Sequence, residues 1–334
     1  MDSLTQLTFG AAVGELVLGE KVGRKAMLWG GILGTLPDLD VLIPLDGPVA
    51  DFVYHRGFSH SMILLAAVTP LFAWLITRIH PATRRHLRGW MLLTFLVLQV
   101  SVILDLLTIY GTQIFWPLDD TPRAWPTLFI IDPLLTIPVL VGVAAALLTR
   151  RPIGPRLNRV GLVLSFLYVL WAAGAHHVVD RQVRDELARR EVTYSRLVST
   201  PAPFNTLLYR FVGIDGDRYF ETYRSVFDGA APLAIRHYPR NLELLDGLED
   251  HPPVARLRWF TRGMYAAVQQ EDDIIVKDLR MGSEPNYVFR FKVGRVGAPA
   301  PVPVPDEQFA REFDRDQLTW VWRRIWDPIP TYEP

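Results

Sequence analysis

The feature that most constrains this chain is a series of long apolar segments in its first half. A helix needs about 20 mostly apolar residues to cross a bilayer. Two segments, at about 3–19 and 26–44, are apolar but short and rich in glycine, as helices that pack closely in lipid tend to be, and they either span or are re-entrant. Four further segments reach the full length, at about 61–79, 89–109, 127–148 and 159–179.

Charge divides the chain near Asp180. Residues 1–179 carry 24 Asp, Glu, Lys and Arg residues, whereas residues 180–334 carry 46. The sequence therefore predicts an α-helical integral membrane bundle over 1–179, with four clear and two shorter N-terminal helices, followed by a small soluble α+β domain over 180–334. The overall charge is balanced, with 35 basic and 35 acidic residues, which argues against a nucleic-acid partner.

The second domain contains patterns typical of both helices and strands. Residues 178–192 predict a charged helix that leaves the membrane, and 264–282 predict two short strands around an acidic turn. Apolar and polar residues alternate over 286–294, which indicates another strand. The proline-rich stretch 297–307, "GAPAPVPVPDE", predicts an extended linker.

The short loops predict how the bundle is oriented in its membrane. Lys and Arg gather at 19–25, 78–88 and 149–159, whereas 44–51 and 117–126 are acidic or near neutral. Because basic loops favour the cytoplasmic side, both termini and the second domain are expected on the periplasmic or extracellular side. The chain is then multi-pass, and its histidines and aspartates fall at the outer ends of the segments.

One short stretch, "HRGFSHS", places His55 and His60 just before an apolar segment. On a continuous helix their spacing would separate them by about 140°, which is poor geometry for one metal. Gly57 and Ser59 favour another arrangement, with His55 in a loop, Ser59 capping the next helix and His60 in its first turn. The two imidazoles could then converge on a metal, although interfacial histidines without a ligand role remain an alternative.

Three aspartates could complete such a site. Asp38 and Asp40 end an apolar segment in "TLPDLDVLIP", where extended chain after the proline would point both the same way. They could bind one metal or share metal binding and proton transfer, or they could form a polar helix end. Asp105 lies inside an apolar segment, where an ionisable group is costly and hence a functional candidate. Ser101, one turn earlier, could hydrogen-bond to it.

The remaining candidates have more ordinary interpretations as well. Asp132 precedes a proline, which is the pattern of a helix N-cap, but it could also support a metal ligand. His176 and His177 end the last apolar segment, and at most one of them is expected to face a shared site because neighbours on a helix point about 100° apart. Arg56 could contact an anion beside a metal or anchor to lipid headgroups.

Five stretches carry a resemblance to a known family: "MDSLTQLTFGAAVGE", "GGILGTLPDLDVL", "HRGFSHS", "LDLLTIYGTQIFWP" and "FIIDPLLTIP". Taken in order, they resemble the YdjM-like family of bacterial inner-membrane metal-dependent hydrolases, also described as LexA-binding. The resemblance covers residues 1–180, and the second domain is similar to an extension that one branch of the family carries. The resemblance implies a metal-binding membrane domain with ligands at Asp38, Asp40, His55, His60 and Asp105.

The chain departs from that family pattern at two positions. It has Gln6 and Ser101 where many relatives have histidine, and Ser101 removes a potential ligand that His176 or His177 could replace. The chain also has a looser resemblance to zinc-dependent phospholipase C and related phosphoesterases. We use it only to choose the expected substrate class, which is a phosphoester. We therefore expect a divalent metal, with zinc first and manganese or iron as alternatives.

The main functional hypothesis is a membrane-embedded metal-dependent hydrolase that acts near the outer membrane–water interface on a phosphoester or lipid-like substrate. Asp40 or Asp38 would accept a proton, and Arg56 would steady an anionic substrate. The alternative is a non-catalytic metal-binding or structural membrane protein whose soluble domain binds a partner. A transporter fits less well. Transporter sites usually lie near the bilayer midplane, whereas the ionisable residues of this chain gather at one face of the membrane.

Overall fold

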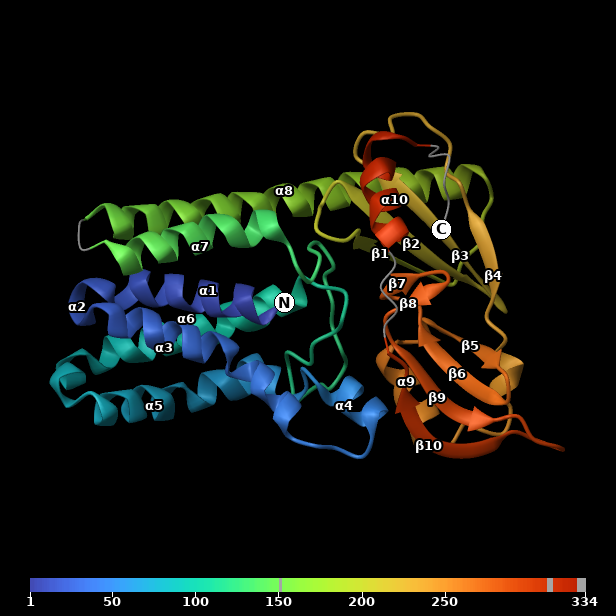
Figure 1. Cartoon of the computed structure of the whole chain (residues 1–334), viewed down its shortest axis with the longest axis horizontal. Coiled ribbons are helices and arrows are strands. Elements are labelled where there is room, and N and C mark those ends of the chain that lie inside the picture. The colour runs from blue at the N-terminus through green and yellow to red at the C-terminus, as the bar shows by residue number, and fades with distance from the viewer. Residues whose placement is uncertain (150–151, 311–314, 329–334) are drawn as a thin grey trace. The chain divides into compact units, whose positions relative to one another are not determined.

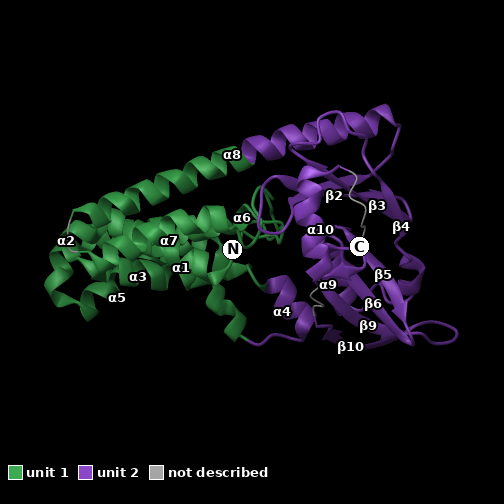
Figure 2. Cartoon of the chain, turned by 45° about the horizontal axis from the view of Figure 1, so that its top comes forward, with its two compact units in different colours: residues 1–43, 55–172 green, residues 44–54, 173–334 purple. Residues whose placement is uncertain are grey.

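A computed structural model describes residues 1–149, 152–310 and 315–328. The chain forms two compact units (Figure 2). Unit 1 comprises residues 1–43 and 55–172, and unit 2 comprises residues 44–54 and 173–334. The main division thus lies between Ala172 and Ala173, near the predicted one, but the sequence did not predict that residues 44–54 would group with the C-terminal region.

Unit 1 is helical (Figure 1), and the helical part of the predicted fold class is confirmed. Its elements, where η marks a 3-10 or π-helical turn, are α1 (Ser3–Gly14), η1 (Glu15–Gly19), α2 (Glu20–Val22), α3 (Arg24–Thr35), η2 (Pro37–Leu42), η3 (Phe58–His60), α5 (Met62–Ile79), η4 (Pro81–His86), α6 (Leu87–Leu106), α7 (Pro133–Leu148) and the first part of α8 (Ile153–Arg189).

Within the described residues, three helical stretches are long and apolar enough to cross a membrane: Met62–Ile79, Pro81–Leu106 and Ile153–Arg189. The fourth predicted segment, 127–148, is wrong in extent, because α7 has only 16 residues. The Asp132 side chain accepts hydrogen bonds from the backbone of Leu134 and Leu135, so the helix starts at Pro133 and not earlier.

Glycines bring α1 and α3 into very close contact. A methyl group added to Gly10 would lie 2.2 Å from the Gly30 carbonyl oxygen, and one added to Gly30 would lie 2.2 Å from the Gly10 oxygen. Gly14 meets Ala26 in the same way. This is the small-residue packing by which helices associate in lipid, and it explains why both predicted segments are rich in glycine.

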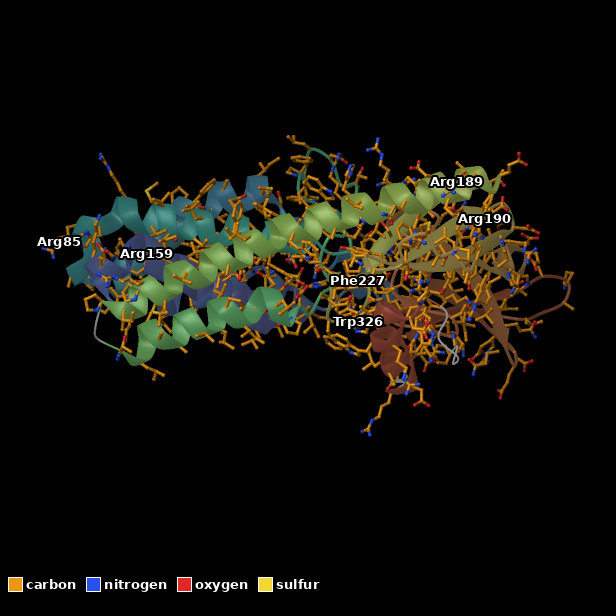
Figure 3. The ribbon with its side chains drawn as sticks, turned by 90° about the horizontal axis from the view of Figure 1, so that it is seen from above. Arg85, Arg159, Arg189, Arg190, Phe227 and Trp326 are labelled. Atoms are coloured by element: carbon orange, nitrogen blue, oxygen red, sulfur yellow. The ribbon has the colours of Figure 1, made fainter. Side chains whose placement is uncertain are left out.

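The basic segments of unit 1 gather at one end of its helices. In Figure 1, α2 and η4 lie at the same end as the start of α8, and η2 and η3 lie at the other. Arg85 and Arg159 both lie at the basic end (Figure 3). Arg150 and Arg151, which belong to the third predicted basic loop, fall outside the described residues.

Unit 2 combines antiparallel sheets with helices, as predicted. One sheet has the order β1-β2-β3-β4, a second has the order β10-β9-β6-β5, and β7 pairs with β8. Its elements are α4 (Pro48–Tyr54), β1 (Arg196–Pro201), β2 (Leu208–Asp215), β3 (Arg218–Ser225), β4 (Arg236–Pro239), η5 (Leu242–Leu245), α9 (Pro252–Phe260), β5 (Tyr265–Gln270), β6 (Asp273–Asp278), β7 (Gly282–Ser283), β8 (Asn286–Tyr287), β9 (Arg290–Arg295), β10 (Val302–Gln308) and α10 (Arg315–Trp326).

Helix packing explains how unit 2 buries its sheets. Along the second part of α8, Val179, Val183 and Leu187 recur every four residues and pack against Tyr209 and Phe211 of β2. A spacing of four residues keeps side chains on one helical face, so this face covers the first sheet. The predicted helix over 178–192 is therefore correct as far as Arg189, where α8 ends, and it continues from the last apolar segment without a break.

Two elements of unit 2 differ from the sequence prediction. The proline-rich stretch 297–307 was expected to be a linker, but β10 pairs with β9 at the edge of the second sheet. An edge strand tolerates prolines because one side of it needs no hydrogen bonds. Residues 44–54 join this unit because the Phe52 ring packs against Phe260, Phe289 and Phe291, with ring centroids 4.3–5.2 Å apart.

Candidate metal centre

Three side chains of unit 1 converge where a metal ion could be held. Asp38 lies in η2, His60 ends η3, and Asp105 lies in the last turn of α6. One ligand atom from each lies within 4.8 Å of the other two. The His60 Nε2 atom is 3.2 Å from Asp38 Oδ1 and 3.3 Å from Asp105 Oδ2. The aspartates come from elements far apart in sequence, so the helical packing assembles this triad.

The His60 ring is fixed from its other side. Its Nδ1 atom lies 2.9 Å from the Ser59 hydroxyl and 3.8 Å from Asp40 Oδ2, and the side chain is fully buried. Such a contact orients an imidazole and leaves Nε2 for a metal. Burial alone lowers the pKa of His60, but hydrogen bonds to Asp105 and Asp38 raise it above its ordinary value.

Asp40 and His55, which were also predicted as ligands, form a pair beside the triad. Asp40 Oδ1 is 2.9 Å from His55 Nδ1, and Asp40 Oδ2 accepts from the Ser59 hydroxyl at 2.6 Å and from the Arg56 backbone at 3.2 Å. Burial raises the pKa of Asp40, but the hydrogen bonds from His55 and Ser59 lower it below its ordinary value. The carboxylate is thus stabilised in its charged form.

Arg56 is buried against Asp105 and does not extend into solvent. Its Nη2 atom is 3.1 Å from Asp105 Oδ1, Nη1 donates to the Thr108 hydroxyl at 3.0 Å, and the guanidinium lies 4.8 Å from the Tyr110 ring centre. Its backbone is left-handed, with φ of 65°. A non-glycine residue held this way at a polar cluster is a feature of functional sites.

The two positions that depart from the family pattern contact each other. Ser101 Oγ lies 2.8 Å from Gln6 Oε1, and Gln6 Nε2 donates to Asp105 Oδ2 at 3.1 Å. Ser101 therefore acts on Asp105 through Gln6, not directly as the sequence suggested. The α-amino group of Met1 also contacts Asp105.

The other predicted residues are not members of the triad. Asp132 is fully buried, caps α7 and accepts a hydrogen bond from the Tyr168 hydroxyl at 2.9 Å. His176 belongs to unit 2, where its Nε2 atom is 2.6 Å from the Ser199 hydroxyl and its ring stacks on Tyr209. His177 also belongs to unit 2 and is exposed.

Two local predictions around the site are wrong. Ser61, not Ser59, caps α5, because its hydroxyl accepts from the Leu64 backbone, and Ser59 instead bonds to Asp40. Asp38 lies in a 3-10 helix with Asp40, not in extended chain. Because successive residues of a 3-10 helix are about 120° apart, Asp38 faces the triad while Asp40 faces the pair with His55.

Sequence reasoning also missed Thr108 and Tyr110, the two side chains that support Arg56. Both lie in the quoted stretch "LDLLTIYG", directly after Asp105. The signal that could have found them is polar residues just beyond a buried carboxylate. It was missed because a threonine and a tyrosine at the end of an apolar segment are also ordinary interfacial residues.

The donor set suits a divalent metal. Two carboxylates and one imidazole are ligands that zinc, manganese and iron accept, and ligand type alone does not select among them. Three carboxylates, those of Asp38, Asp40 and Asp105, lie in the cluster beside two cationic groups, the Arg56 guanidinium and the Met1 α-amino group, and a divalent cation would balance the remaining negative charge. Asp105 is fully buried, where an uncompensated carboxylate would be costly.

The fold and this cluster define a class of protein: a helical membrane protein with an Asp–His site at one end of its bundle. The chain belongs to the YdjM inner membrane protein family, whose model matches residues 1–178. Membership of this family, which the sequence motifs suggested, is thereby confirmed over residues 1–178. A relative, the uncharacterized protein YfhP of Bacillus subtilis, is 29% identical over 155 residues, which cover 43% of this chain and 46% of that protein. No solved structure matches the chain.

Proposed function

We propose that this protein is a metal-dependent hydrolase that acts on a phosphoester or similar amphiphile at the outer face of the inner membrane. The observation that carries the proposal is the convergence of Asp38, His60 and Asp105. These residues would hold the metal, for which zinc is our first candidate. A divalent metal supplies Lewis acidity, which lowers the pKa of a water that it binds and polarises the bond to be cleaved.

The pair beside the triad has the groups that proton transfer requires. The Asp40 carboxylate would accept the proton of the attacking water, while its partner His55 is partly exposed and would donate a proton to the leaving alcohol. The water oxygen then bonds to phosphorus and the ester P–O bond breaks. Arg56 is buried, so it would hold Asp105 in place through their ion pair and would act on an anionic substrate through its charge and not by direct contact.

Exposed apolar side chains next to the site favour an amphiphilic substrate. Val41 and Leu42 directly follow Asp40 and are 66% and 73% exposed. Ile43 and Phe58 are exposed as well. In a membrane protein such residues are expected to contact lipid, so the polar cluster would lie at headgroup depth. A lipid phosphoester could then reach the site without leaving the bilayer.

The location of the basic segments supports an outer-face site. They lie at the end of the bundle opposite η2 and η3 (Figure 1). Since basic segments favour the cytoplasmic side, the Asp–His cluster would face the periplasm. Unit 2, which contains the C-terminal part of α8, would then be periplasmic as well.

The contacts of Asp105 favour a second candidate function, a non-catalytic role for the cluster. Arg56 occupies one of its oxygens, and Gln6 and His60 occupy the other. A fully partnered carboxylate can hold helices together without catalysis. In this alternative the cluster is structural or binds metal without turnover, and unit 2 binds a partner.

A hydrolysis assay on reconstituted protein distinguishes the hydrolase from the non-catalytic alternative. Wild type, His60→Ala and Asp132→Asn would be supplied with zinc, manganese or iron and offered phosphatidylglycerol, phosphatidic acid and a soluble aryl phosphodiester. We expect wild type and Asp132→Asn to release product and His60→Ala to lose activity. Metal binding without product from any substrate would support the second function. Equal activity in His60→Ala would show that the product has another source.

A further inference from the structure

Unit 2 has a cluster of exposed aromatic rings that the proposed chemistry does not use. Phe227, in the loop after β3, is 55% exposed, and Trp322 and Trp326 of α10 are 47% and 65% exposed. Phe227 and Trp326 stack with ring centroids 4.9 Å apart and an interplanar angle of 17° (Figure 3). Trp322 and Trp326 are four residues apart and therefore share a helical face. We call these three residues the aromatic patch.

Buried hydrogen bonds hold the patch in a fixed shape. Arg324 forms two 2.7 Å bonds to the Asp228 carboxylate, and both side chains are buried. Ser225 Oγ donates to the Ile325 carbonyl at 2.7 Å, and Arg324 also donates to the Tyr223 carbonyl at 2.9 Å. These bonds fasten the Phe227 loop to α10. Burying the Arg324–Asp228 pair has a desolvation cost. The structure that this pair holds in place nevertheless exposes three apolar rings.

The loop that contains Phe227 exposes small apolar residues and no carboxylate. Its one acidic side chain, Asp228, is turned inward to Arg324, and Ala230 and Pro232 are exposed. Arg224 donates to the Ala231 carbonyl at 2.6 Å, which keeps the loop closed. Exposed aromatic rings gathered in this way are typical of a surface that contacts another molecule or a membrane.

The connection to α8 favours a membrane over a protein partner. The helix continues from an apolar span into unit 2, and its last 17 residues, 173–189, rise only about 25 Å. Unit 2 is thus tied close to a bilayer surface. Trp is enriched at membrane–water interfaces because its ring is apolar while its N–H can meet water, and Arg323 on the same face of α10 can reach headgroups.

We infer that unit 2 docks on the lipid headgroup region through the aromatic patch, with the Phe227, Trp322 and Trp326 rings inserted at the interface. The exposed face of α10 carries acidic as well as basic residues, namely Arg315, Asp316 and Arg323, and the exposed Asp327 directly follows the helix. Docking should therefore depend on the rings and not on the fraction of anionic lipid. This inference does not depend on the metal centre.

The absence of cysteine allows a direct test by spin labelling of the full chain. A label at Thr319→Cys lies one turn before Trp322 on the exposed face of α10, and a label at Gln270→Cys lies at the exposed end of β5. Each variant would be placed in phosphatidylcholine nanodiscs, with and without phosphatidylglycerol. The collision rates of each label with oxygen, which concentrates in lipid, and with an aqueous nickel chelate would then be compared.

We expect the label at position 319 to favour oxygen in both lipid compositions and the label at position 270 to favour nickel. Adding Phe227→Ala and Trp326→Ala should invert the preference at position 319, whereas Val302→Ala, an exposed apolar residue of β10, should leave it unchanged. A label at position 319 that favours nickel in the otherwise native chain would overturn the inference. One shielded from both reagents would also overturn it, because protein would then cover the patch.

Discussion

Adjacent glycines in α3 provide a sharp test of the close α1–α3 packing. A methyl group on Gly30 would lie 2.2 Å from the Gly10 carbonyl oxygen, whereas one on Gly31 would lie 3.5 Å from the nearest atoms of Leu7. Ordinary contact needs about 3.5 Å, so Gly30→Ala requires α1 and α3 to separate by about 1 Å. Gly31→Ala requires no movement and is the matched control.

The expected loss of stability follows from this difference. Overpacking typically costs about 1–3 kcal/mol, and a rigid backbone oxygen puts Gly30→Ala near the upper value. Replacing glycine by alanine within a helix raises the free energy of unfolding by about 1 kcal/mol, and this gain applies to both variants. The net loss of about 2 kcal/mol for Gly30→Ala corresponds to a midpoint of thermal unfolding about 4–8 °C lower.

Thermal unfolding in nanodiscs, followed by circular dichroism, would compare wild type with both variants. Gly31→Ala should match or exceed the wild-type midpoint. Separation of the helices should also disturb the site, because Gln6 on α1 donates to Asp105 and the Gly34 carbonyl of α3 accepts from Ser101. Equal midpoints for Gly30→Ala and Gly31→Ala would refute the close packing.

Three further predictions test the polar contacts. Gln6→Leu should weaken metal retention about 10–100-fold, and Ser101→Ala should weaken it less because it acts through Gln6; equilibrium dialysis would measure both. Asp132→Ala should cost about 1 kcal/mol of stability as a lost helix cap while metal content stays unchanged, and a loss of metal would show that it is a ligand. In unit 2, Glu221→Gln should destabilise by about 3–5 kcal/mol because it leaves the buried Arg210 charge unpaired, and pairing it with Arg210→Met should restore part of that loss in thermal unfolding.

Much of the fold could be predicted from the sequence because hydropathy and charge are properties of single segments. The division near Asp180, the strands within 264–282 and the helix over 178–192 all follow from composition and periodicity. The role of 297–307 could not be predicted in this way, because pairing with β9 depends on a partner strand and not on the stretch itself. Residues 44–54 joined unit 2 for the same reason, through rings that lie more than 200 residues away in sequence.

The candidate site was predictable in its residue types but not in its geometry. Asp38, His60 and Asp105 were identified because ionisable residues at the ends of apolar segments are costly. The separation of Asp40 and His55 into a neighbouring pair depends on a 3-10 helix that the sequence pattern does not distinguish from extended chain. The link from Ser101 through Gln6 required α1 and α6 to be placed side by side.

Metal content tests the central claim most directly. Detergent-purified wild type, His60→Ala, Asp105→Asn and Asp132→Asn would be incubated with zinc, manganese or iron, washed and measured by plasma mass spectrometry, with folding checked by circular dichroism. We predict near-stoichiometric metal in wild type and Asp132→Asn, and its loss in folded His60→Ala and Asp105→Asn. Folded wild type that retains none of these metals would contradict the account and leave the Asp–His cluster as a structural polar contact.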